Sequence, residues 1–108
     1  MAKYVLIESR DSFTTQAVLG HFELAVGLRR SGSEVALYLV QNGVLPARAG
    51  ADGGALHEAL AAGVAVYADD FSLRERGIAD ADVARGVKPA GIDLVVQRLA
   101  DGSKVLFL

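Results

Sequence analysis

The sequence has no cysteine and no tryptophan, and only two histidines and two prolines in 108 residues. Without cysteine, a disulfide scaffold, a thiolate metal site and a cysteine nucleophile are all excluded. Two isolated histidines do not make a histidine-rich zinc site, so we expect no metal and no cofactor. The low proline content and the 22% of charged residues argue against a disordered tail protein.

Basic charge and long apolar stretches are also scarce. Eleven Lys and Arg stand against thirteen Asp and Glu, which leaves a net charge of −2 and no basic excess for a phosphate backbone. No uncharged apolar stretch approaches the ~20 residues of a membrane span, and the apolar run at the start is too short for a signal peptide. We therefore expect a cytoplasmic protein with neither nucleic-acid nor membrane partners.

What the sequence does contain is a regular alternation of elements in one domain, residues 1–108, with 52% apolar residues. Continuous apolar, β-rich runs at 4–7, 35–40, 64–67 and 105–108 are typical of strands covered on both faces. Segments of helical periodicity separate them. This order predicts a small flavodoxin-like α/β fold, a three-layer sandwich with an open, mainly parallel sheet.

The helical segments have recognisable ends. The first is predicted to begin near Phe13, capped by Asp11 or Ser12, and to end at 29–30 before a glycine C-cap. The second spans about Gly53 to Ala62. A third has one apolar face, formed at helical spacing by Ile92, Val95, Val96 and Leu99. Residues 41–54 are expected to form a long loop.

Ligands of open α/β sheets bind beyond the carboxyl ends of the strands, where the strand order reverses. If the first strand is central between the second and the third, this switch point lies between strands one and three. The polar residues that this arrangement gathers into a candidate binding rim are Arg10, Asp11, Ser12, Asn42, Asp69, Asp70, Ser72 and Arg76.

Each candidate also has a plainer interpretation. Ser12 and its neighbours could hold an anion on backbone N–H groups or simply cap a helix, and the cap is favoured. Asp69 and Asp70 could bind a cation or act as a base, but a solvated loop or helix cap is favoured. His21 is interpreted as a packed or interface histidine and His57 as exposed, and a catalytic role is disfavoured because no Ser or carboxylate partner is visible for either. No nucleotide-binding glycine motif follows any strand.

The chain resembles the DsrE/DsrF-like family over essentially its whole length. The resemblance rests on Ser33–Leu39 with Gln41–Val44, and on Gly63–Tyr67 leading to Ser72–Ile78; Arg76-Gly77-Ile78 is the most specific part. It implies a small parallel α/β fold and assembly into homo-oligomers, with a trimer or hexamer favoured. It also implies a sulfur-relay context, in which family members pass sulfur as a cysteine persulfide.

The family's cysteines lie just before the Arg-Gly-Ile stretch, where this sequence has Asp69 and Ser72. Neither a carboxylate nor a hydroxyl can hold transferable sulfane sulfur, so we expect no persulfide sulfurtransferase activity. The first hypothesis is therefore a non-catalytic oligomeric subunit, a partner or regulator of another sulfur-relay protein. The alternative is a small-molecule (anion) binding protein or enzyme at the strand 1/strand 3 rim, using Arg10 and Asp69 or Asp70.

Overall fold

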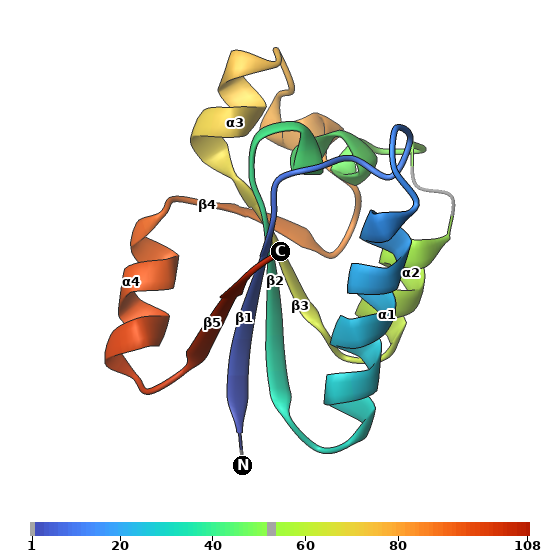
Figure 1. Cartoon of the computed structure of the whole chain (residues 1–108). Coiled ribbons are helices and arrows are strands. Elements are labelled where there is room, and N and C mark those ends of the chain that lie inside the picture. Colours follow the sequence, from blue (N-terminus) through green and yellow to red (C-terminus); the bar gives the residue numbers. More distant parts are fainter. Residues whose placement is uncertain (1, 52–53) are drawn as a thin grey trace.

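The computed structural model describes residues 2–51 and 54–108, and they form one five-stranded sheet in which every pairing is parallel (Figure 1). The strand order is β4-β3-β2-β1-β5. The strands are β1 (Lys3–Glu8), β2 (Glu34–Leu39), β3 (Ala65–Asp69), β4 (Val87–Ala90) and β5 (Lys104–Phe107). The predicted α/β class with an open parallel sheet is confirmed.

The helices cover the two faces of this sheet unequally. Figure 1 shows α1 and α2 together on one side, α4 alone on the other, and α3 beyond the carboxyl ends of the strands. The helices are α1 (Ala17–Arg30), α2 (Ala55–Ala61), α3 (Asp70–Glu75) and α4 (Asp93–Ala100), with 3-10 helices η1 (Gln41–Ala47) and η2 (Asp80–Asp82). The result is a three-layer sandwich with one thick and one thin outer layer.

The core is divided by the sheet into two clusters of different size. The larger one lies under α1 and α2 and includes Leu6, Phe22 and Leu37. The smaller one joins the other face of β1 and β2 to Val95 of α4. Side chains alternate along β1, because successive strand residues point to opposite faces; Leu6 therefore faces α1, whereas its neighbours Val5 and Ile7 face α4.

The predicted position of β1 between the second and third strands is wrong, since β1 pairs with β2 and β5. Sequence patterning did not reveal β4, a four-residue strand that contains Pro89. Proline is tolerated there because β4 is an edge strand. The chain adds β2, β3 and β4 in one direction, and α4 then leads back to β5. The order therefore reverses between β1 and β5, not between β1 and β3.

Element ends also differ from expectation. The first helix begins at Ala17 rather than Phe13, because the Asp11 carboxylate accepts the backbone N–H groups of Phe13 and Thr14 and closes a turn ahead of the helix. At its other end Gly32 adopts the expected left-handed conformation, with φ of 100°. Much of the expected loop after β2 is η1.

The second helix begins at Ala55; its predicted start, Gly53, lies outside the described residues. Within the described part of the chain, no helix is both long enough and apolar enough to cross a bilayer.

Candidate functional site

Asp69 and Ser72 form a closed hydrogen-bonded clasp at the carboxyl end of β3. The Asp69 carboxylate is the N-cap of α3: its Oδ2 accepts the Ser72 N–H at 3.0 Å and the Ser72 hydroxyl at 2.6 Å. The Ser72 Oγ in turn accepts the Gln41 N–H at 2.8 Å. The favoured interpretation of Asp69 as a helix cap is confirmed, and the clasp ties α3 to the start of η1.

The second carboxylate oxygen of Asp69 is engaged by Tyr38, which projects from β2. The buried Tyr38 hydroxyl donates to Asp69 Oδ1 at 2.9 Å and also lies 3.2 Å from the Ala90 carbonyl. Burial of the phenol, together with the hydrogen bond to Asp69 and the nearby carboxylates of Asp70 and Asp93, raises the pKa of Tyr38 well above its ordinary value. Tyr38 is therefore a protonated donor that locks the clasp to β2 and β4.

The start of η1 passes unusually close to the end of β1. Gln41 has φ of 51°, a left-handed conformation that is uncommon for a residue other than glycine. Two residues later, a Cβ on Gly43 would lie 2.3 Å from the Glu8 carbonyl oxygen, so only glycine fits at this crossing. The three strand ends β1, β2 and β3 are thus held together by backbone contacts as well as by the clasp.

Arg76 is the fixed cation of the rim. Its Nε and Nη2 donate to Asn42 Oδ1 at 3.1 and 3.0 Å, and its Nη1 donates to the Ser72 carbonyl at 3.2 Å. These acceptors are neutral; the nearest carboxylate, that of Glu75, is 3.8 Å from Nη1 and more than half exposed. The structure therefore brings Asn42, Ser72 and Arg76 together, as the sequence predicted, and orients a guanidinium at the surface.

The remaining predicted rim residues do not join this network. Arg10 is exposed, Ser12 is partly exposed, and Asp11 is buried in the turn before α1, where its Oδ1 also accepts the Thr14 hydroxyl. Asp70 lies 3.9 Å from Arg74 in an exposed i,i+4 pair. In the described residues, no three His, Cys, Asp or Glu side chains gather as a metal site, so Asp69 and Asp70 are not part of a site for a hard cation.

The sequence missed a pair of ionisable groups next to the rim. Glu8, the last residue of β1, is fully buried and faces α1, where its Oε1 lies 2.5 Å from His21 Nδ1. Its Oε2 accepts the Ser9 N–H at 3.0 Å. The His21 side chain is 23% exposed, so the imidazole connects a buried carboxylate to the surface. His21 is packed as predicted, but the judgement that it lacks a carboxylate partner is wrong.

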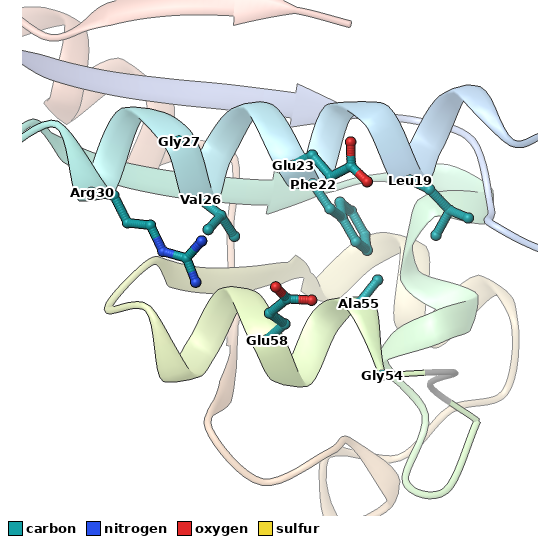
Figure 2. Close-up of a pocket in the computed structure, with 9 residues that line it drawn as sticks. All are labelled: Leu19, Phe22, Glu23, Val26, Gly27, Arg30, Gly54, Ala55 and Glu58. Carbon is teal, nitrogen blue, oxygen red and sulfur yellow. The ribbon is translucent and has the colours of Figure 1, made fainter.

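A groove of about 520 Å³ lies elsewhere, between α1 and α2, and shares no residue with the rim. Figure 2 shows Phe22 and Val26 at its base and the charged ends of Glu23, Arg30 and Glu58 around it. It is open to solvent and has no polar side chain buried within it. The two helices pack through small and apolar residues, and this packing accounts for the groove without any need for a ligand site.

No protein-family model matches the chain, and no curated protein matches it in sequence. Solved structures do match. The structure of the YchN protein from E. coli is similar over 100% of both chains, with a TM-score of 0.88 and 22% sequence identity. MTH1491 from Methanobacterium thermoautotrophicum also covers 100% of both chains, with a TM-score of 0.87 and 20% identity.

The chain has the fold of these proteins. BT1422 from Bacteroides thetaiotaomicron is similar over 98% of this chain and 94% of its own, with a TM-score of 0.72 and 20% identity. MTH1491 and BT1422 are described as proteins of unknown function, and identities of 20–22% establish the fold alone. The likeness therefore supports the architecture and leaves the activity to be argued from the residues.

Chemically, the clasp is a structural device. Ser72 is buried, donates its proton to Asp69 and accepts from Gln41, so its hydroxyl has no path to a substrate. Both oxygens of Asp69 are likewise used. Across the described residues, every buried side-chain nitrogen or oxygen has a hydrogen-bond partner. The groups that remain available at this edge are the oriented Arg76, the exposed Arg10 and the imidazole of His21.

Proposed function

We propose that this protein is a DsrE/DsrF-like subunit that carries no sulfur and acts through its surfaces, as an oligomeric partner or regulator of a sulfur-relay protein in the cytoplasm. The observation that carries the proposal is the clasp. Where the family places a reactive thiol, this chain has a helix-capping carboxylate and a buried hydroxyl, both fully hydrogen-bonded. The residues at this position still connect a strand to a helix, but they provide no nucleophile.

The fold supports the relay context only in part. Full-length similarity to YchN and MTH1491 places the chain among proteins with the same small parallel architecture. The family resemblance adds the expectation of a homo-trimer or homo-hexamer. A subunit of this kind would occupy a place in an assembly without taking cargo, so that its effect would be exerted on a partner that has the cysteine.

The first test is covalent. The purified chain is incubated with a polysulfide donor, and its intact mass is measured. We expect no added sulfur, because the protein contains no thiolate. An Asp70→Cys variant, with a thiol at a partly exposed rim position beside the clasp, is the positive control and should gain sulfur. Uptake of sulfur by the unmodified chain would contradict the proposal.

The second test concerns assembly and uses light scattering on the same preparation. The proposed subunit should have a mass of at least twice 11.3 kDa at micromolar concentration. A strictly monomeric mass across this range would leave a subunit role without support, whatever the result of the sulfur test.

One observation favours a second candidate function, binding of a small anion at the rim. Arg76 is held in place mainly by neutral acceptors, so much of its charge remains available for an anionic group. Arg10, which the sequence also assigned to anion binding, would be the second cation. Asp69 would contribute only by holding the clasp together. Thermal-shift measurements with sulfate, thiosulfate and phosphate test this idea. Stabilisation that is lost in Arg76→Gln would support it, and no shift with any of the three would reject it.

A further inference from the structure

The thin outer layer of the sandwich leaves an apolar surface exposed, and α4 forms most of it. In a parallel sheet both faces are normally covered by helices, yet here one face has only the eight-residue α4 (Figure 1). Ile92, Val96 and Leu99 are 54–61% exposed, although they share an apolar helix with the buried Val95. Ile92, Val95, Val96 and Leu99 form one apolar face of this helix, and because only Val95 is buried, most of that face is left open to solvent.

Phe107 of β5 extends the same surface. Residues alternate along a strand, so Phe107 faces the same side as Val105, which packs in the cluster beneath α4. The Phe107 side chain is 72% exposed, the highest fraction among the large apolar residues exposed in the described chain. We call Ile92, Val96, Leu99 and Phe107 the α4–β5 surface.

We infer that the α4–β5 surface is the contact through which a second copy of this chain docks, with the two α4 helices antiparallel across a two-fold axis. The inference rests on the proposed function, which requires an assembly, and adds where the copies meet. A two-fold contact uses the same surface on both copies, so one exposed apolar helix supplies both halves of the interface.

The area fits this occupant. The exposed fractions of the four side chains correspond to on the order of 450 Å² of apolar surface per copy. A stable protein–protein contact buries about 800 Å² per partner, with an apolar centre and a polar rim. The α4–β5 surface therefore supplies a centre of suitable size, and the polar residues that flank α4 would supply the rim.

The charges around α4 favour the antiparallel arrangement. Asp93 begins the helix, whereas Arg98 and Lys104 against Asp101 leave one net positive charge near its end. In an antiparallel pair, Asp93 of one copy lies near the positively charged end of the other copy's helix, so the side-chain charges attract. The two helix dipoles also point in opposite directions, which is favourable. A membrane surface is a poorer fit, because interfacial helices carry a predominantly basic polar face.

One substitution with two controls tests the inference on the full-length protein. Val96→Glu places a charge at the centre of the α4–β5 surface, and light scattering should then give at most half the mass of the unmodified assembly. Gln97→Glu adds the same charge to the next residue of α4, and Leu24→Glu adds it to α1, on the opposite face of the sheet, where Leu24 is 42% exposed. Both controls should keep the original mass.

A cross-linking experiment does not depend on the folding of Val96→Glu. Because the chain contains no cysteine, Val96→Cys has a single thiol, and a short bis-maleimide should convert it into a covalent dimer. Leu24→Cys should remain monomeric on a denaturing gel under the same conditions. Dilution well below the assembly concentration should abolish the Val96→Cys product, which separates a specific contact from random collision.

The outcomes separate this inference from the proposed function. An assembly that keeps its mass in Val96→Glu, with no cross-linking through Val96→Cys, overturns the inference and leaves the oligomeric subunit intact. Dissociation by Leu24→Glu in place of Val96→Glu would put the contact on α1. If the unmodified chain is monomeric and does not cross-link, both proposals fail together.

Discussion

Glu8 and His21 show how one buried side chain can join two layers of the fold. The Glu8 carboxylate is fully buried at the end of β1 and is satisfied by His21 from α1 and by the Ser9 backbone. Removing one member of a buried hydrogen-bonded pair leaves the polar group of the other without its partner, and this is more destabilising than replacing both. The pair is therefore expected to couple strongly in stability measurements.

A double-mutant cycle measures this coupling. Glu8→Gln, His21→Gln and the double variant should give a coupling in the free energy of unfolding of about 1–3 kcal/mol, as found for residues in direct contact. Urea denaturation of the four proteins provides the values. The matched control pairs Glu8→Gln with Lys104→Gln, which lies beside Tyr4 at the far end of β1 and should be additive to within about 0.5 kcal/mol. Additive effects of Glu8→Gln and His21→Gln would contradict the expectation.

Tyr38 makes stability depend on alkaline pH. Its pKa is raised in the folded protein, so above pH 10 the unfolded chain releases a phenolic proton that the native state keeps. Unfolding is then favoured as pH rises, and this residue should lower the free energy of unfolding by about 1.4 kcal/mol per pH unit. The contribution is constant below pH 10.

Tyr38→Phe should be less stable near neutral pH but should lack this part of the alkaline loss. Chemical denaturation of both proteins between pH 8 and about pH 11.5 compares the slopes. Tyr4→Phe is the control and should keep the slope, because Tyr38 is still present. Equal slopes in Tyr38→Phe and the unmodified protein would show that the phenol is not held protonated.

At the residue scale, sequence reasoning could identify positions but not pairs. Asp69 and Ser72 were singled out because they follow an apolar strand, and the cap expected for Asp69 is local in sequence. Glu8 and His21 are 13 residues apart on different elements. Their contact depends on which face of β1 is opposite which side of α1, and a single sequence does not provide that register.

At the level of elements, the crossing of η1 over β1 should depend on glycine. In Gly43→Ala, the new Cβ would meet the Glu8 carbonyl at 2.3 Å, a backbone clash that a rotamer change cannot relieve. We expect a loss of about 2–4 kcal/mol in the free energy of unfolding. Gly20→Ala, at the fourth residue of α1 with nothing within 4 Å of its Cβ, should instead gain about 0.5–1 kcal/mol. Thermal or urea unfolding of the pair checks both signs, and a neutral Gly43→Ala would mean that η1 can move away from β1.

Whether a strand formed a continuous apolar run decided how well it could be predicted. The long helix α1 and the apolar strands β1, β2 and β3 were evident, because burial on both faces leaves a continuous apolar run. The four-residue β4 was not, since Val87–Ala90 includes a lysine and a proline. Periodicity predicted α4 correctly, but an apolar stripe does not tell whether it faces the core or a partner, and Ile92, Val96 and Leu99 are exposed.

For the whole molecule, the proposed contact between copies predicts that stability depends on protein concentration. If copies cover each other's α4–β5 surface, association stabilises the native state and not the unfolded chain. Each tenfold increase in concentration should then raise the melting temperature by about 3–6 °C. Differential scanning fluorimetry across three decades of concentration measures this, and Val96→Glu should show a constant midpoint. A constant midpoint in the unmodified protein would argue against assembly.

The sequence predicted the α/β class and the parallel sheet, but not the strand order. Successive strand–helix–strand units fit several orders equally well, and the choice depends on which face each connection covers. Here α1 and α2 cover one face and α4 the other, so β5 is placed beside β1. This correction moves the point of reversal to the edge where Glu8 and His21 lie, away from the Asp69 clasp.

The pairing of β1 with β5 also has a consequence for biosynthesis. Tyr4 is matched with Lys104, one hundred residues later in the chain. While the ribosome is still translating the intervening segment, one side of β1 has open backbone N–H and C=O groups, and such an edge is a template for aggregation. We therefore expect β1 to be the segment of the nascent polypeptide that depends most on chaperones, until β5 emerges and pairs with it.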